Sequence, residues 1–176
     1  MVRQEAMTLK RFQEKFPTDD ACRQHLFQIR WPNGFRCPKC GHDAYYVLES
    51  RKLYQCTRCK HQASVTAGTI MHKSHMPLRI WFWAIFLAAH DKRGVSAVFL
   101  SRELEISYPT AWLMLHKIRK AMGDRDARYQ LAGLVELDDA FFGAPTEGGK
   151  RGRGTEQTPV LAAVSLNRKG APQYVK

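Results

Sequence analysis

The chain has 176 residues, of which 44% are hydrophobic, and it carries 28 Lys and Arg residues against 16 Asp and Glu residues. This composition excludes an intrinsically disordered chain, and the length accommodates one ordinary core or several small ones. The formal net charge of +12 predicts a polyanionic partner, with nucleic acid as the first candidate. A protein that merely happens to be basic is the alternative.

The sequence contains no signal for secretion or membrane insertion. Residues 1–15 are polar and charged and lack the apolar stretch of a secretory signal. The longest apolar run, residues 80–89, is far shorter than the roughly 20 residues that span a bilayer. We therefore expect no membrane partner and a cytoplasmic, nucleoid-associated protein. In a reducing compartment, its cysteines are expected to bind metal rather than form disulfides.

Residues 1–33 form a predicted N-terminal helical segment. Leu9, Phe12 and Phe16 recur at helical spacing, and the residues from Pro17 to Asp20 then interrupt the pattern. A second helix is expected to follow and to run towards Ile29.

Residues 34–76 form a predicted zinc ribbon. Two Cys-x-x-Cys pairs stand 15 residues apart, and two short β-type runs between them, residues 45–48 and 52–55, predict a hairpin. This spacing lets four thiolates reach one tetrahedral Zn²⁺, and four protein ligands leave no open position, so the zinc is expected to be structural. The predicted zinc ligands are Cys37, Cys40, Cys56 and Cys59.

Alternatives to this ligand set remain. The four cysteines could be buried free thiols, and His42, His61 or His72 could substitute for one of them, although surface histidines are the ordinary case. Cys22 has no partner in the sequence and is expected to be a small core residue.

Residues 77–126 form a predicted helix-turn-helix region. An apolar helix over residues 78–91 is followed by a helix over 96–104, a tight link over 105–107 and a third helix to about residue 122. A linker is expected over residues 123–126. In the third helix, a stripe of apolar side chains is assigned to the core: Ala111, Leu115, Ile118 and Met122.

The opposite face of the third helix is the candidate DNA-binding surface. It combines hydrogen-bonding, methyl-contacting and phosphate-pairing groups, as recognition helices in the major groove do. A solvated basic face is the alternative, and Trp112 fits either the core or a base contact. The candidate DNA-binding residues are Tyr108, Thr110, Leu113, Lys117 and Lys120.

Residues 127–176 form a predicted segment of strands. A strand over residues 131–139 ends in carboxylates, a Gly-rich and basic loop follows over 143–158, and further strands are expected at 159–166 and at the end of the chain. Acids at the end of an apolar strand can hold a divalent ion against a phosphodiester in an RNase H-like nuclease. They can equally mark the point where a strand meets water.

In this order, the features resemble those of bacterial insertion-sequence transposases of the zinc-ribbon, DDE-type group. The resemblance extends from Phe12 to Asn167. Its motifs are Cys37-Pro38-Lys39-Cys40-Gly41, Gly94-Val95-Ser96-Ala97, Ser107-Tyr108-Pro109-Thr110-Ala111-Trp112 with Met114-Leu115-His116, Val135-Glu136-Leu137-Asp138, and Lys150-Arg151-Gly152-Arg153-Gly154.

The resemblance implies a function and a fold. Such transposases recognise terminal inverted repeats in double-stranded DNA, act on DNA as homo-oligomers, and cut and transfer strands with two Mg²⁺ ions. Asp138 corresponds to the first catalytic, magnesium-binding acid. The implied fold is α+β and multi-module: N-terminal helices and a zinc ribbon, a helix-turn-helix unit, and the first strands of an incomplete RNase H-like α/β domain.

The chain departs from the family pattern at two points. Asp139 stands where the family usually has Glu, and whether Asp139 or Glu136 also contributes to metal binding is open. The later catalytic acids of the family lie beyond residue 176, so we expect a C-terminally truncated transposase that does not transpose DNA unaided. A catalytically dead DNA-binding regulator or remnant is one alternative, and a zinc-ribbon adaptor that binds protein is another.

Overall fold

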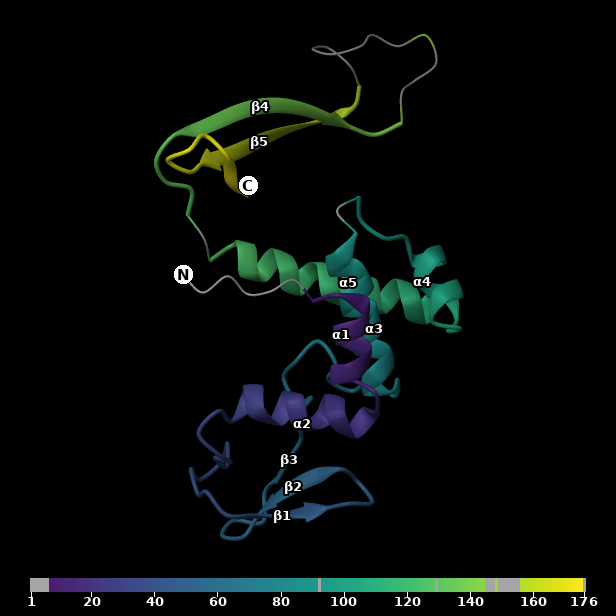
Figure 1. The fold of residues 1–176 in the computed structure, drawn as a ribbon, viewed down its shortest axis with the longest axis vertical. Coiled ribbons are helices and arrows are strands. Elements are labelled where there is room, and N and C mark those ends of the chain that lie inside the picture. Colours follow the sequence, from purple (N-terminus) through teal and green to yellow (C-terminus); the bar gives the residue numbers. More distant parts are fainter. Residues whose placement is uncertain (1–6, 92, 129, 145–147, 149–155, 176) are drawn as a thin grey trace. The chain divides into compact units, whose positions relative to one another are not determined.

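The computed structural model describes residues 7–91, 93–128, 130–144, 148 and 156–175. The chain divides into two compact units, Met1–Lys120 and Ala121–Lys176. Helices and small antiparallel sheets make up a mixed α+β fold, which confirms the predicted fold class (Figure 1). The division into four modules and the RNase H-like assignment of the last strands stay predictions.

Two short helices open the described chain, as predicted. α1 spans Leu9–Lys15 and α2 spans Asp19–Arg30. Each begins at a threonine whose side-chain oxygen accepts a hydrogen bond from a backbone N–H group, Thr8 from Arg11 and Thr18 from Ala21. Such caps satisfy N–H groups that have no partner inside the helix.

A three-stranded antiparallel sheet follows α2. β1 (Tyr45–Leu48) pairs with β2 (Leu53–Cys56), and β2 pairs with β3 (Gln62–Ala63). The predicted hairpin is therefore confirmed, whereas β3 was not predicted. With only two residues, β3 shows no alternating pattern in the sequence.

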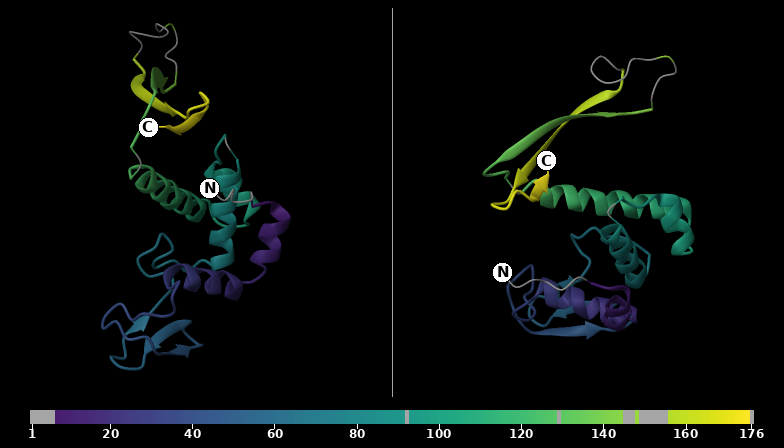
Figure 2. Two further views of the ribbon diagram at one scale, coloured as in Figure 1. Left: turned by 60° about the vertical axis from the view of Figure 1, so that its left-hand side comes forward. Right: turned by 45° about the horizontal axis from the view of Figure 1, so that its top comes forward.

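Three further helices complete the first unit: α3 (Leu78–His90), α4 (Ala97–Glu103) and α5 (Tyr108–Asp126), the last of which continues into the second unit. The N-terminus of α3 is capped from α2, because the Asp19 carboxylate accepts N–H groups of Leu78 at 3.3 Å and Arg79 at 2.9 Å. α3 lies in the main core, against α1, α2 and α5 (Figures 1 and 2). Within the described residues, no helix is long and apolar enough to cross a membrane.

The predicted linker over residues 123–126 is wrong. These residues belong to α5, and Ala127 donates its N–H group to the carbonyl of Gly123 at 2.9 Å. Glycine in a helix costs about 1 kcal/mol relative to alanine but does not forbid the conformation. The helix therefore passes Gly123 and ends four residues later than expected.

The second unit contains an antiparallel sheet of β4 (Val135–Phe142), β5 (Thr158–Leu166) and β6 (Pro172–Val175), in that order. All three predicted strands are present. β4 begins at Val135 rather than at residue 131, after Gly133 with its positive φ of 77°. Much of the predicted loop over residues 143–158, with the Lys150-to-Gly154 motif, lies outside the described residues.

Candidate metal centre and nucleic-acid interface

The four predicted zinc ligands converge on one point. Their Sγ atoms lie within 4.8 Å of one another, with Cys37 at 3.5 Å from Cys59 and Cys40 at 3.6 Å from Cys56. Four sulfurs at about 2.3 Å from a tetrahedral zinc ion lie about 3.8 Å apart. The donor set and its spacing therefore fit structural zinc.

The ligands come from two loops with the same backbone geometry, which we term the first knuckle (residues 37–42) and the second knuckle (residues 56–61). In each, the first cysteine donates its N–H group at 2.9 Å to a histidine carbonyl five residues on, His42 or His61. The residue after the second cysteine, Gly41 or Lys60, has a positive φ and donates back to the first cysteine. Only Gly41 could be expected from the sequence.

Backbone amides lower the pKa of the first cysteine in each knuckle, whereas the neighbouring thiols of Cys59, Cys56 and Cys37 raise the pKa of Cys40 to about 12. Burial raises the pKa of Cys37, but the N–H groups of Cys40 and Lys39, together with the thiols of Cys59 and Cys40, outweigh burial and lower it to about 7. Burial also raises the pKa of Cys56, and the amides of Cys59 and Arg58 again lower it overall. Because the thiolate is the form that binds zinc, these amides favour the ligand state.

The remaining cysteine and the nearby histidines lie outside this cluster. Cys22 is completely buried in the helical core, and burial raises its pKa to about 11, so it is a neutral packing residue as expected. His42 and His61 contribute backbone carbonyls to the knuckles, and His72 is exposed. Within the described residues, the four cysteines are the only potential metal-binding group of three or more His, Cys, Asp and Glu side chains.

Helix α2 and the ribbon share a core. Trp31, at the end of α2, donates its indole N–H group to the carbonyl of Arg36 at 3.0 Å, and Phe27 packs beside Tyr54 with ring centroids 4.9 Å apart. The core of this part combines Trp31, Phe35, Cys37, Tyr54, Cys56, Ala63 and Val65. The zinc site is thereby fixed to the helical part of the unit.

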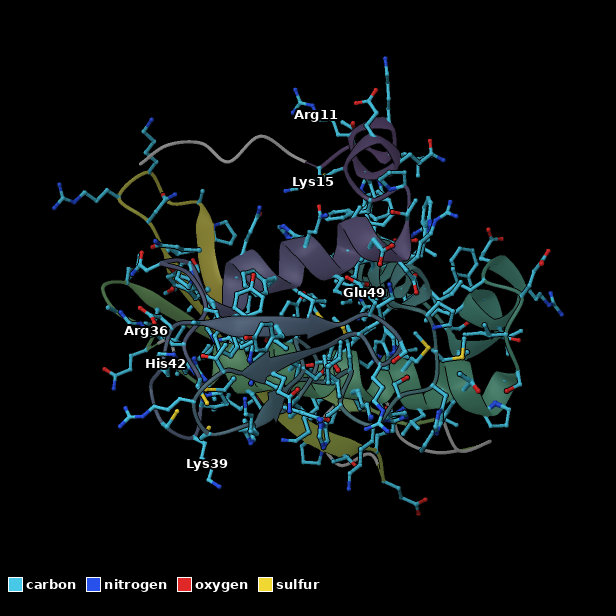
Figure 3. The ribbon with its side chains drawn as sticks, turned by 90° about the horizontal axis from the view of Figure 1, so that it is seen from below. Arg11, Lys15, Arg36, Lys39, His42 and Glu49 are labelled. Atoms are coloured by element: carbon cyan, nitrogen blue, oxygen red, sulfur yellow. The ribbon has the colours of Figure 1, made fainter. Side chains whose placement is uncertain are left out.

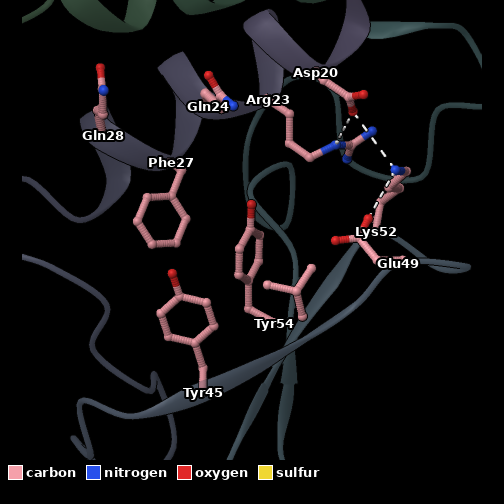
Figure 4. Close-up of a pocket in the computed structure, with 10 residues that line it drawn as sticks. Asp20, Arg23, Gln24, Phe27, Gln28, Tyr45, Glu49, Lys52 and Tyr54 are labelled. Carbon is pink, nitrogen blue, oxygen red and sulfur yellow. Dashed lines mark hydrogen bonds and ion pairs between the residues drawn. The ribbon is translucent and has the colours of Figure 1, made fainter.

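A groove of about 480 Å³ separates α2 from the hairpin (Figure 4). Its charged side chains pair with one another: Lys52 lies 3.8 Å from Asp20 and 3.2 Å from Glu49. Arg23 lies 3.7 Å from Asp20. Because two cations face two carboxylates, this groove offers no net positive charge to a nucleic acid.

The knuckles carry exposed cations. Lys39 and Arg58 occupy the same position in the first and second knuckle, directly before the second cysteine, and both are exposed. Arg36 is also exposed and donates to the carbonyl of Gly41 at 3.3 Å. Figure 3 shows the Lys39 side chain extending outward from the ribbon. This end of the ribbon is suited to contact phosphates.

α4 and α5 form the predicted helical pair. Ser96 caps α4 by accepting the N–H group of Phe99 at 3.1 Å, and the link contains Glu105 at a φ of 52°. Arg119 of α5 donates to the carbonyl of Val95 at 3.0 Å, which ties α5 to the start of α4. The core between them consists of Val95, Ala97, Leu100, Ala111 and Leu115.

The predicted DNA-binding residues divide between two environments. Tyr108, Leu113 and Lys120 are exposed, whereas Thr110 and Lys117 are half-buried. The Lys117 ammonium lies 5.9 Å from the ring centre of Trp81. Trp112, which the sequence left open, is 48% exposed and therefore does not belong to the core. Of the predicted core stripe, Ala111, Leu115 and Ile118 are buried, whereas Met122 is 49% exposed, so its assignment is wrong.

Asp138 lies in the middle of β4, opposite Ala162 of β5, and is exposed. Its carboxylate accepts the N–H group of Asp139 at 2.9 Å. Glu136 is two residues away and so on the same side of the strand. These two carboxylates do not make a two-metal clamp, and the described residues alone do not fit a pair of Mg²⁺ ions.

Comparisons with known proteins agree with the zinc site. Residues 17–62, which contain α2 and both knuckles, match the family model of the transposase zinc-ribbon domain. Over 130 residues, the chain is 31% identical to a Halobacterium salinarum protein described as an uncharacterized protein in transposable element ISH50. That alignment covers 72% of this chain but only 42% of the relative. No solved structure matches the chain. The two similarities support a transposase-related chain with structural zinc.

Proposed function

We propose that the chain is the DNA-binding portion of an insertion-sequence transposase, and that it recognises terminal inverted repeats in double-stranded DNA. The observation that carries this proposal is the combination, in one unit, of a four-cysteine zinc site and a helical pair with an exposed, cationic second helix. The similarity to a transposase zinc ribbon supports it.

The two parts would divide the work of binding. Side chains of α5 would read base edges in the major groove, with Tyr108, Thr110 and Leu113 as candidates and with Lys117 and Lys120 towards phosphates. The exposed knuckle cations, Lys39 and Arg58 among them, would contact phosphates without reading sequence. Because the two ends of an element are joined in one reaction, we propose that the chain acts on DNA as a homo-oligomer.

Strand cleavage is proposed only for the complete transposase. There, the β4–β6 sheet would open an RNase H-like domain, and Asp138 would hold Mg²⁺ together with acids other than those in the described residues. When bound, Mg²⁺ would polarise the phosphodiester and activate the attacking hydroxyl. The relative in ISH50 is more than twice as long as the stretch matched here, which is consistent with this division.

A DNA-binding regulator without catalysis is the second candidate. The observation in its favour is that Asp138 joins no group of three potential metal ligands among the described residues. Both candidates require duplex binding, so cleavage of a terminal-repeat duplex with Mg²⁺ distinguishes them. A protein-binding adaptor would bind no duplex at all.

The salt dependence of duplex binding tests the proposal. We would measure the affinity of the zinc-loaded chain for a labelled 30-base-pair duplex by fluorescence anisotropy, between about 50 and 200 mM salt. Affinity is expected to fall steeply with salt, because Lys and Arg side chains that pair with phosphates release counterions from the DNA. Lys120→Ala should reduce the slope of log affinity against log salt by about one.

The matched control is Lys169→Ala, which removes an exposed lysine from the turn between β5 and β6. The slope of log affinity against log salt should be the same for this variant as for the native chain. A chain that binds no duplex at low salt, or that binds with an affinity independent of salt, would contradict the proposed function.

A further inference from the structure

The outer face of α5 is a continuous exposed stripe. Positions at steps of three and four lie on one side of a helix. The buried residues of α5 are Ala111, Met114, Leu115 and Ile118. The stripe on the opposite side, which we term the outer face, consists of Pro109, Trp112, Leu113, His116 and Lys120, all exposed.

Two large apolar side chains are exposed on this face. Trp112 is 48% exposed and Leu113 is 51% exposed. The Trp112 ring packs on His116 with centroids 4.0 Å apart, so its orientation is held by a neighbour one turn further along. Exposed apolar side chains that share one helix face form a candidate binding surface.

The charges on α5 favour a nucleic acid as the occupant of this surface. From Tyr108 to Gly123 the helix contains no Asp or Glu, whereas Lys117, Arg119 and Lys120 all fall in this stretch. A polyanion meets no carboxylate along this part of the helix. The apolar pair is thus bordered by cations, as expected of a helix that lies between two phosphate backbones.

Two of these cations are held against the protein. Arg119 donates to the carbonyl of Val95 at 3.0 Å, and the Lys117 ammonium lies over the Trp81 ring. Both are therefore placed beside the outer face rather than on it. The large apolar side chains on the outer face are Trp112 and Leu113, and their carbon surfaces can contact an apolar feature of a base but not its hydrogen-bonding edge.

We propose that Trp112 and Leu113 are specificity-determining residues that contact thymine methyl groups in the major groove. This inference rests on the proposed function. The thymine 5-methyl group is the apolar feature of the major-groove edge, so it is the feature that apolar side chains can discriminate. Removing one buried methyl group is expected to weaken binding roughly fourfold.

Uracil-substituted DNA tests the contact directly, because uracil keeps the base pair of thymine and lacks its methyl group. The zinc-loaded full chain would first enrich bound sequences from a pool of 20-base-pair random duplexes. Each thymine of the enriched duplex would then be replaced by deoxyuridine, and affinities would be compared by anisotropy. We expect a roughly fourfold loss at one or two thymines.

Trp112→Ala should bind thymine and uracil duplexes equally well at one of those positions. Leu113→Ala is a second variant, and it should lose the difference in affinity between thymine and uracil at a neighbouring thymine. Met122→Ala is the matched control, because Met122 is 49% exposed on the same helix and lies about 15 Å further along its axis. It should keep the native preference for thymine.

Failure of this inference differs from failure of the proposed function. If the chain enriches a sequence but uracil never weakens binding, or if both variants keep the native preference, the contact is absent while DNA recognition stands. An enriched pool without any preferred sequence also overturns the contact. If Trp112→Ala instead dissolves an oligomer without changing the preference, the outer face is a protein interface. If no duplex binds at low salt, the proposed function itself is wrong.

Discussion

The five cysteines have two roles, since one packs in the core and four are placed to bind metal. Cys22 lies in an apolar core that favours the neutral thiol, whereas Cys37 and Cys56 receive backbone N–H groups that favour the thiolate. The spacing of the pairs was sufficient to predict which cysteines meet. It could not indicate the amide contacts, because these depend on the backbone of each knuckle.

We predict that Cys56→Ser abolishes stoichiometric zinc binding and unfolds the ribbon. Cys56 is completely buried, and apparent binding free energies of structural zinc sites are about 10–16 kcal/mol, so the ribbon depends on its metal. Zinc content by elemental analysis and the circular dichroism of the purified variant would show both effects.

Cys22→Ala is the matched control for this prediction. It should retain one zinc ion per chain and lose on the order of 1 kcal/mol of stability, because it removes a small buried group from the helical core. A Cys22 variant without zinc, or a Cys56 variant with a full complement of zinc, would contradict the assignment of ligands.

His25 is expected to make the stability of the helical core dependent on pH. Burial, with a smaller contribution from Lys15, lowers its pKa below the ordinary value near 6.5. As the pH falls through about 6.5, the unfolded chain takes up a proton before the folded chain does, so stability is lost. Above that value both states are neutral and the loss disappears.

Thermal unfolding at pH 7.5 and pH 6.0 would test this effect, with zinc content monitored at both values. His25→Gln, which cannot take up the proton, should show a smaller decrease in Tm between the two pH values than the native chain. Equal decreases in the two proteins would mean that His25 is as easily protonated in the folded state as in the unfolded state.

At the scale of elements, two glycines with opposite conformations test the boundaries of the helices. Gly123 is helical, and a Cβ atom there would meet nothing within 4 Å, so Gly123→Ala should stabilise the chain by up to about 1 kcal/mol. Gly94 has a φ of 81° and is equally open. Gly94→Ala should therefore cost about 1–2 kcal/mol from backbone strain alone.

Denaturant unfolding of the two variants measures both changes. If residues 123–126 were a flexible linker instead of the end of α5, Gly123→Ala would have almost no effect on the free energy of unfolding. That result would contradict the assignment of residues 123–126 to α5 and favour the predicted linker.

Helix signals in this sequence were more informative than strand signals. α2 and α4 begin close to their predicted starts, where Thr18 and Ser96 form local caps. The short β3 and the late start of β4 depend on strand partners, so the sequence around them carries little signal. The cap of α3 by Asp19 joins residues 59 and 60 positions apart, so the local sequence could not predict it.

At the scale of the molecule, the net charge predicts a polyanionic partner but does not indicate which surface would bind it. The groove beside α2 is charged but internally neutralised, whereas α5 and the knuckles present exposed cations. The exposure of Trp112 settled a choice that periodicity left open, because its helical position borders both the core and the outer face. Recognition of duplex DNA by a zinc-ordered unit is therefore the central claim.

The most direct test is the affinity of the chain for duplex DNA with and without zinc. We would measure anisotropy of a labelled random-sequence duplex at low salt for the zinc-loaded chain, for the chain after chelation, and after zinc is restored. The account predicts tight, salt-sensitive binding that is weakened by chelation and recovered with zinc. A chain that holds zinc yet ignores the duplex, or that binds it equally well without zinc, would contradict the account.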